Sequence, residues 1–170
     1  MSDPAVDELL AKQAITEALY RYCRGLDRMD RPMASRTWHP GGTADYVGMF
    51  KGTGEGFLDW VWPQHAAMYR HSHQITNILT AVDGDRAGSE AYVTVALRMK
   101  DGDDITDITS KGRYLDQWSR RDGVWAVDDR VFVEDFNTII STPGATASHG
   151  TEASRRDPED PSYKVLPNPG

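Results

Sequence analysis

Apolar residues in the first part of the chain recur at the spacing of an α-helix. Within residues 6–27, Ile15, Leu19, Tyr22 and Leu26 follow one another at steps of four, three and four, which places them on one face of a helix. The polar residues that come next end this pattern. We therefore predict an amphipathic helix over residues 6–27.

Shorter elements are expected in the segment that follows. Pro32 favours the start of a second helix, because the first position of a helix needs no N–H donor. Residues 39–43, with the sequence HPGGT, are predicted to form a turn, and residues 44–47 a short strand. Residues 54–70 again have an apolar helical face, which we expect Pro63 to break or kink.

From His71 onwards the hydrophobic pattern has a period of two, which is typical of β-strands. Four strands are predicted, over residues 71–82, 86–100, 105–120 and 124–136. Short turns with glycine separate them, as in antiparallel hairpins. Helices followed by such a meander predict an α+β fold, in which a curved antiparallel sheet wraps around the N-terminal helices as a cone-shaped barrel.

The composition changes near the end of the chain. The last thirty residues contain five of the nine prolines and few large apolar side chains, so they bury too little surface to offset the entropy of ordering. We expect one domain over residues 1–140. Residues 141–170 are predicted to form an extended or partly disordered tail that lies over the body or over a neighbouring subunit.

Composition and charge exclude several classes of protein. The 170 residues suit one domain with a hydrophobic core, and Cys23, as the only cysteine, rules out an internal disulfide. The net charge of −7 disfavours nucleic-acid binding. No apolar run approaches the roughly 20 residues that span a bilayer, and the acidic N-terminus does not resemble a signal peptide. We expect a cytoplasmic protein that binds neither nucleic acid nor membranes.

Three of the five histidines, His65, His71 and His73, lie close together in the sequence. A zinc site needs three or four converging ligands, and this neighbourhood has neither an HExxH motif nor a pair of cysteines. We therefore predict no metal site. His65 is expected at the end of a helix, without a chemical role.

The period-two pattern gives His73 a more specific position. His73, Ile75, Asn77 and Leu79 share one face of the predicted strand, so His73 is either buried or lines a cavity. Asp27, at the end of the first helix, is a suitable partner, because a carboxylate that accepts from one imidazole nitrogen leaves the other free to take a proton. Spacing alone leaves open the alternatives of a helix-end Asp27 that faces water and a histidine with only a structural role.

Four segments carry a resemblance to a known family. AITEALYRYCRGLDRMD, SHQITNI, VDGDRA and GRYLDQWSRRDGVWAVDDR, in this order, resemble the SnoaL-like branch of the nuclear transport factor 2-like superfamily, over about residues 8–137. Each motif alone is weak, and the ordered set is fairly specific to the branch. The resemblance implies the cystatin-like cone of that superfamily, which agrees with the predicted meander, and dimers or trimers of the chain.

Within the branch, the sequence is similar to scytalone dehydratase, bile-acid 7α-dehydratase and hexachlorocyclohexane dehydrochlorinase. The resemblance implies a lyase that needs no cofactor and uses a His–Asp pair, which His73 and Asp27 match. Tyr22 matches a tyrosine that assists the bile-acid enzyme, whereas the dehydrochlorinase has a lysine there. An arginine of the dehydrochlorinase falls near Arg120 and Arg121, and the sequence does not choose between them.

Other residues are expected to bind the substrate, which we predict to be a small hydrophobic or aromatic molecule. Tyr114 and Asp116 share a face of the third strand, and His71 is expected beside the site as a secondary polar group. The predicted substrate-binding residues are Trp38, Tyr46, Trp60, His71, Asn77, Tyr114 and Asp116. Core packing is the alternative for the aromatic residues, and a structural role for Asp116.

The predicted function is elimination, preferably dehydration, with His73 as the general base. One alternative is a cofactor-free C–C lyase that releases formaldehyde from a lignin-derived diarylpropane, and another is an isomerase like ketosteroid isomerase. Non-catalytic alternatives are a small-molecule-binding protein and a subunit of a larger enzyme, as in aromatic-ring dioxygenases. The sequence names neither the substrate nor the oligomeric state.

Overall fold

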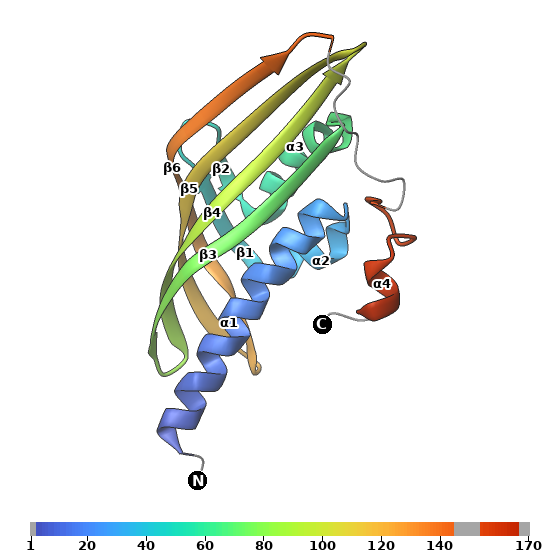
Figure 1. Cartoon of the computed structure of the whole chain (residues 1–170). Helices are drawn as coiled ribbons and strands as arrows, with labels where there is room; N and C mark the ends of the chain where they lie inside the picture. Colours follow the sequence, from blue (N-terminus) through green and yellow to red (C-terminus); the bar gives the residue numbers. More distant parts are fainter. Residues whose placement is uncertain (1–2, 145–153, 167–170) are drawn as a thin grey trace.

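The computed structural model describes residues 3–144 and 154–166, which form an α+β fold (Figure 1). The elements are α1 (Pro4–Asp27), α2 (Arg31–Ser35), β1 (Trp38–Tyr46), β2 (Phe50–Thr53), α3 (Gly54–Ala67), β3 (Arg70–Asp83), β4 (Arg86–Asp101), β5 (Asp104–Arg121), β6 (Val124–Thr142) and α4 (Ser162–Val165). The predicted first two helices and four long strands are thereby confirmed.

The last turn of α1 packs closely against α2 at Gly25. Asp3 caps the start of α1, because its side chain accepts a hydrogen bond from the backbone N–H of Ala5. At Gly25 in the last turn, a Cβ atom would lie 2.6 Å from the backbone nitrogen of Ala34 in α2. Glycine therefore permits this close packing of α2, and Asp27 is held at the corner between the two helices.

The structure overturns one local prediction between residues 38 and 67 and decides part of another. Residues 39–43 do not form a simple turn but belong to β1, whose pairing with β6 is irregular between Trp38 and Thr43. That pairing is non-local, so the local pattern did not show it. Pro63 does not break α3, which continues to Ala67. The buried face of α3 offsets the hydrogen bond that proline removes.

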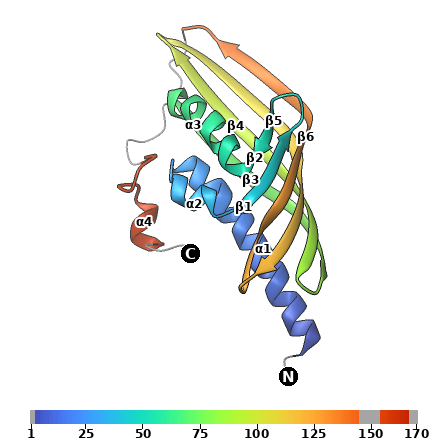
Figure 2. The ribbon, with the colours of Figure 1, turned by 180° about the vertical axis from the view of Figure 1, so that it is seen from behind.

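The predicted α+β fold, with a curved sheet around the N-terminal helices, is confirmed. In detail, the sheet is open rather than closed and includes one parallel pair of strands. Its strand order is β2-β1-β6-β5-β4-β3, and all neighbours are antiparallel except β1 and β6, which are parallel. Figure 2 shows the curved sheet from behind, with α1, α2 and α3 along one of its faces. The space between these helices and the sheet contains the core and the site described below.

A bulge in β3 changes which residues face the helices. The pairing of β3 with β4 shifts between Thr76 and Leu79, and Asn77 has a φ of 49°. The strand therefore exchanges its faces at this point. His73 and Ile75 lie on the inner face, but Asn77 and Leu79 are exposed. The prediction that these four residues share a face is wrong for the last two.

The end of the chain divides into a longer strand and a separate segment. β6 continues to Thr142, two residues past the expected domain boundary. Residues 154–166 contain α4 and lie beside α1 and α2 (Figure 1). The predictions for residues 145–153 and 167–170 fall outside the described part of the chain. Within the described ranges, none of the helices is long and apolar enough to cross a membrane.

Candidate active site

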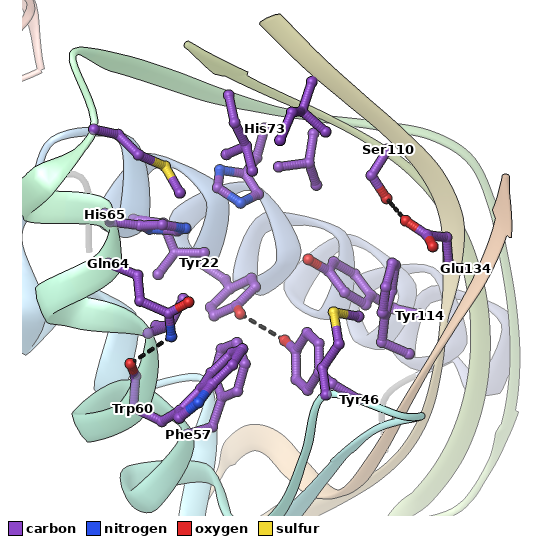
Figure 3. A pocket seen from close by; sticks show the side chains of 18 residues that line it. Tyr22, Tyr46, Phe57, Trp60, Gln64, His65, His73, Ser110, Tyr114 and Glu134 are labelled. Atoms are coloured by element: carbon purple, nitrogen blue, oxygen red, sulfur yellow. Dashed lines mark hydrogen bonds between the residues drawn. The ribbon is translucent and has the colours of Figure 1, made fainter. Parts of the chain in front are cut away.

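A hollow of about 240 Å³ lies between the helices and the inner face of the sheet (Figure 3). Aromatic rings form one part of its wall, and aliphatic side chains from β4 and β5 form another. The aromatic residues are Tyr22, Tyr46, Phe57, Trp60, Tyr114 and Phe132, and the aliphatic residues of the two strands are Val95, Leu97 and Ile108. Such a wall suits an apolar molecule that contains a ring.

Asp27 and His73 meet at one side of this pocket. The ring Nδ1 of His73 lies 2.7 Å from Oδ1 of Asp27, and the backbone nitrogen of His73 lies 3.0 Å from Oδ2. A carboxylate only accepts hydrogen bonds, so Nδ1 carries the proton and Nε2 keeps its lone pair. Because the ring forms part of the pocket wall, this lone pair is available to a bound molecule.

His71 holds the same helix end from behind the pocket wall. Its Nε2 donates to the backbone oxygen of Leu26, at 2.9 Å. Leu26 directly precedes Asp27, so two successive residues of α1 are tied to two histidines of β3. This double attachment fixes the position of the Asp27 carboxylate relative to the strand.

The surroundings of His65 and His71 differ from those of His73. The rings of His65 and His71 stack with their centroids 4.4 Å apart, and the centroids of His65 and His73 are 5.5 Å apart. Burial, with smaller contributions from His73 and His71, lowers the pKa of His65 to about 2. Burial also lowers the pKa of His71. Both rings are therefore neutral near pH 7, and neither has the carboxylate partner that His73 has in Asp27.

Three tyrosines provide polar groups inside the pocket. The hydroxyls of Tyr22 and Tyr46 are 2.7 Å apart, and the hydroxyl of Tyr114 points toward the same space (Figure 3). Burial raises the pKa of all three tyrosines. They therefore stay protonated, and their hydroxyls can donate hydrogen bonds to an oxygen of a bound molecule.

A buried ion pair lies behind these tyrosines. Arg130 donates two hydrogen bonds of 2.7 Å to Asp116, and both side chains are completely buried. The guanidinium carbon lies 4.2 Å from the ring centroid of Tyr114 and 4.6 Å from that of Tyr22. Asp116 is therefore committed to Arg130, whose positive charge faces the rings of the tyrosines.

The structure brings together some of the predicted site residues and separates others. Tyr22, His73, Tyr46, Trp60 and Tyr114 all line the pocket, and Asp27 lies directly behind His73. Four predicted substrate-binding residues do not line it, for different reasons. These are Trp38, which packs against Tyr22; His71, which binds Leu26; Asn77, which follows the bulge outward; and Asp116, which pairs with Arg130.

The two alternative arginines also lie away from the pocket. Arg120 donates to Asp85 at 2.7 Å, and Arg121 forms an ion pair with Asp128. Both belong to hairpin ends of the sheet, where partial exposure makes them surface ion pairs. Arg130 is the arginine that the structure places next to the pocket tyrosines.

Several pocket residues were not predicted as substrate contacts. They include Met49, Gln64, His65, Ser110 and Glu134, of which Ser110 donates to Glu134 at 2.6 Å. A helical repeat would have indicated His65, because Phe57, Val61, His65 and Met68 recur at steps of four, four and three. No comparable pattern marks Glu134, since its place depends on the pairing of β6 with β5.

The histidines do not form a metal site in the part of the chain that the structure describes. Within residues 3–144 and 154–166, no group of three or more histidine, cysteine, aspartate or glutamate side chains is placed to hold a metal ion. His65 and His71 stack face to face instead of converging on one point. The arrangement is suited to proton transfer at His73 through the contact with Asp27.

The sequence assigns the chain to a family. Residues 7–131 match the SnoaL-like domain, and the chain therefore belongs to this family, within the nuclear transport factor 2-like superfamily. The resemblance predicted from the motifs is confirmed. A comparison with curated proteins gave no match.

Solved structures share the fold at low sequence identity. A hexachlorocyclohexane dehydrochlorinase of type 2 has a TM-score of 0.74 and 21% identity, over 86% of this chain and 99% of that chain. The type 3 dehydrochlorinase from Novosphingobium barchaimii has a TM-score of 0.70 and 21% identity, over 85% and 98% of the two chains. A candidate scytalone dehydratase from Novosphingobium aromaticivorans has a TM-score of 0.69 and 20% identity, over 85% and 97%.

Proposed function

We propose that this protein is a cofactor-independent lyase that acts on a small apolar molecule containing a ring. The observation that carries the proposal is the contact between Asp27 and His73 at the wall of an apolar pocket, which leaves Nε2 free to accept a proton. The carboxylate fixes the ring tautomer and stabilises the imidazolium that forms. General-base catalysis of this kind contributes about 10²–10⁴-fold to a rate.

The proposed reaction is an elimination, with dehydration preferred. His73 takes a proton from carbon, and the electron pair of that C–H bond forms a double bond. The hydroxyl on the neighbouring carbon leaves with the C–O electron pair and takes up the proton that His73 removed, so that water is released and His73 is neutral again. The hydroxyls of Tyr22 and Tyr46 share one hydrogen bond, so one of the two O–H groups remains to donate to the oxygen on which negative charge develops. Arg130, near the rings of Tyr22 and Tyr114, adds a fixed positive charge on that side.

The similar structures support this class of reaction. A dehydrochlorinase and a dehydratase both carry out eliminations, although they remove different leaving groups. The volume of the pocket and its aromatic wall suit a small molecule that contains a ring. The hydroxyl donors of the pocket favour a substrate with an oxygen substituent. This combination favours loss of water over loss of halide.

Isomerisation of a ketone is a second candidate, and the three neutral tyrosines favour it specifically. The same base can remove a proton beside a carbonyl while the hydroxyls stabilise the enolate, and the proton then returns to another carbon. Mass spectrometry of the products separates the two reactions. Elimination releases water or halide, whereas isomerisation leaves the mass unchanged.

The proposal is tested first by proton exchange, which requires only a base and a bound carbon acid. The wild-type protein is incubated in D₂O with a panel of cyclic ketones and β-hydroxy ketones, and deuterium at carbon is measured by mass spectrometry. Replacement of His73 by alanine should reduce exchange and turnover by about 10²–10⁴-fold, while the fold is retained.

His39 offers a matched control for removal of an imidazole. It is buried and bonded to the backbone oxygen of Ser119 at 2.9 Å, and it does not line the pocket. His39→Gln should retain exchange and turnover. A His73→Ala variant as active as wild type would show that His73 is not the base. Binding of the ketones without exchange or turnover in the wild type would indicate a non-catalytic binding protein.

A further inference from the structure

The segment of residues 154–166 contacts the back of the histidine cluster through Arg156. The Nη1 of this arginine donates to the backbone oxygen of His65 at 2.8 Å and to the ring Nδ1 of His71 at 3.2 Å. Arg156 is half-buried and does not line the pocket. It therefore contacts the two histidines from outside the pocket.

Specific contacts hold this segment against α1 and α2. Asp160 is buried, accepts hydrogen bonds from the backbone of Arg155 and Ser162, and lies 3.4 Å from the Nε of Arg28. Tyr163 donates to Asp30, the cap of α2, at 3.2 Å, and its ring lies under the guanidinium of Arg24 at 4.8 Å. Arg156 is thus part of an anchored segment rather than an isolated surface side chain.

The two partners of His71 require the same tautomer. A guanidinium can only donate, so Nδ1 of His71 must be the acceptor toward Arg156. A carbonyl can only accept, so Nε2 must carry the hydrogen that is donated to Leu26. Arg156 therefore occupies the one nitrogen of His71 that remains available for a second proton. The ring is held neutral in a single orientation.

This orientation is transmitted to the proposed base over a short path. Arg156 fixes His71, His71 holds the carbonyl of Leu26, and the next residue, Asp27, holds both the ring and the backbone of His73. Every link is a hydrogen bond between described residues, except the peptide bond that joins Leu26 to Asp27. A displacement of His71 would move the end of α1 and so loosen the contact between Asp27 and His73.

We propose that Arg156 is a positioning residue, which fixes the tautomer of His71 and thereby keeps Asp27 and His73 in contact. The effect on turnover rests on the function proposed above, but the effect on the two rings does not. Misplacement of a catalytic group by about an ångström can reduce a rate up to about 10²-fold. We therefore expect loss of Arg156 to lower kcat without a matching change in KM.

The test compares three variants. Arg156→Met removes all donors while it keeps a long unbranched side chain, and Arg156→Lys restores a charge and a donor that can reach one of the two acceptors. The matched control is Arg155→Met, because the neighbouring Arg155 side chain is exposed and pairs with Asp157. Urea denaturation records the stability of each variant, so that loss of fold is not mistaken for loss of positioning.

The first measurement is NMR of protein labelled with ¹⁵N in its histidines. In the wild type, His71 should give signals of one tautomer with the hydrogen on Nε2, and His73 should show a strongly deshielded Nδ1 proton. In folded Arg156→Met, the His71 signals should become an average of tautomers, and the His73 proton should broaden or disappear. Arg156→Lys should be intermediate, and Arg155→Met should resemble the wild type.

The second measurement is kinetics. Arg156→Met should lower kcat about 10-fold or more with KM within about twofold of wild type. Unchanged NMR signals in this variant would overturn the proposal, and so would perturbed signals with an unchanged kcat. If Arg156→Met does not fold, the same criteria apply to Arg156→Lys. Failure of the proposed lyase activity would leave the wild type inactive, whereas the NMR result would still decide whether Arg156 orients the rings.

Discussion

Asp27 and Asp116 each hold a nitrogen at 2.7 Å, yet their surroundings differ. Asp27 bonds to one nitrogen of His73, whose other nitrogen is left at the pocket, and the Asp27 side chain is 15% exposed. Asp116 bonds to two nitrogens of Arg130, and neither side chain is exposed at all. The first pair is accessible to a ligand, and the second is sealed behind aromatic rings.

This difference separates the proposed base from a group that provides a permanent charge. Burial acts to lower the pKa of Arg130, but Asp116 and the tyrosines outweigh it and hold the pKa well above its ordinary value. Arg130 therefore stays charged at every accessible pH. His73 instead presents a ring nitrogen, Nε2, at the pocket wall, while Nδ1 is bonded to Asp27. The comparison predicts that the first pair governs turnover and the second governs stability.

The largest expected effect is the loss of stability when the sealed pair is broken. Asp116→Asn leaves the charge of Arg130 buried among Tyr22, Trp38 and Tyr114 without a counter-charge. Removal of one partner of a buried ion pair costs about 3–5 kcal/mol. Urea denaturation at neutral pH should show a decrease in the free energy of unfolding of this size.

A double variant distinguishes the charge from the shape of the pair. Asp116→Leu combined with Arg130→Met removes both charges and fills the space with apolar side chains, which is often neutral or stabilising at such sites. We expect it to regain most of the stability that Asp116→Asn loses. A double variant as unstable as the single one would mean that packing, and not the unpaired charge, explains the loss.

The second effect is a loss of turnover when the accessible pair is altered. In Asp27→Asn, the amide can present N–H groups to His73 and so favour the wrong tautomer of the ring. Turnover should fall by at least about 10²-fold, while the free energy of unfolding should change by no more than about 1 kcal/mol, because Asp27 is partly exposed. Parallel kinetics and denaturation check this. Equal losses of stability in Asp27→Asn and Asp116→Asn would contradict the proposed division of roles.

The elements that depend on local patterns could be predicted from the sequence. Residues 6–27 and the four long strands carry their period in consecutive residues, and glycine marks the hairpin turns. The candidate pair of Asp27 and His73 was expected mainly from the resemblance to the family, because spacing alone left its role open. The structure brings the two residues into contact through the attachment of α1 to β3.

The features that could not be predicted depend on pairings between distant residues. The parallel neighbours β1 and β6 join segments far apart in the chain, and no local pattern announces this. The partner of Asp116 is set by the β5–β6 register, which places Arg130 directly opposite it. The bulge at Asn77 reverses the faces of β3, so an uninterrupted period of two assigned Asn77 to the wrong side.

A smaller effect extends the comparison to a third buried side chain, that of His65, which has no carboxylate partner among the described residues. The pKa of His65 is about 2 in the folded protein, mainly because of burial, and about 6.5 in an unfolded chain. Below pH 6.5 the His65 side chain binds a proton in the unfolded state but not in the folded state. The free energy of unfolding therefore falls as the pH falls. His65 alone should cost about 2 kcal/mol between neutral pH and pH 5.

Urea denaturation at several pH values between 7 and 5 measures this loss. His65→Gln keeps a polar side chain that does not titrate, so its free energy of unfolding should vary less with pH by about the same 2 kcal/mol. The wild type, measured in parallel at each pH, is the reference. If the stability of His65→Gln depends on pH as strongly as that of the wild type, His65 is not held neutral by burial. In that case, the contrast between His73, paired with Asp27, and His65 would no longer explain why only His73 is proposed as the base.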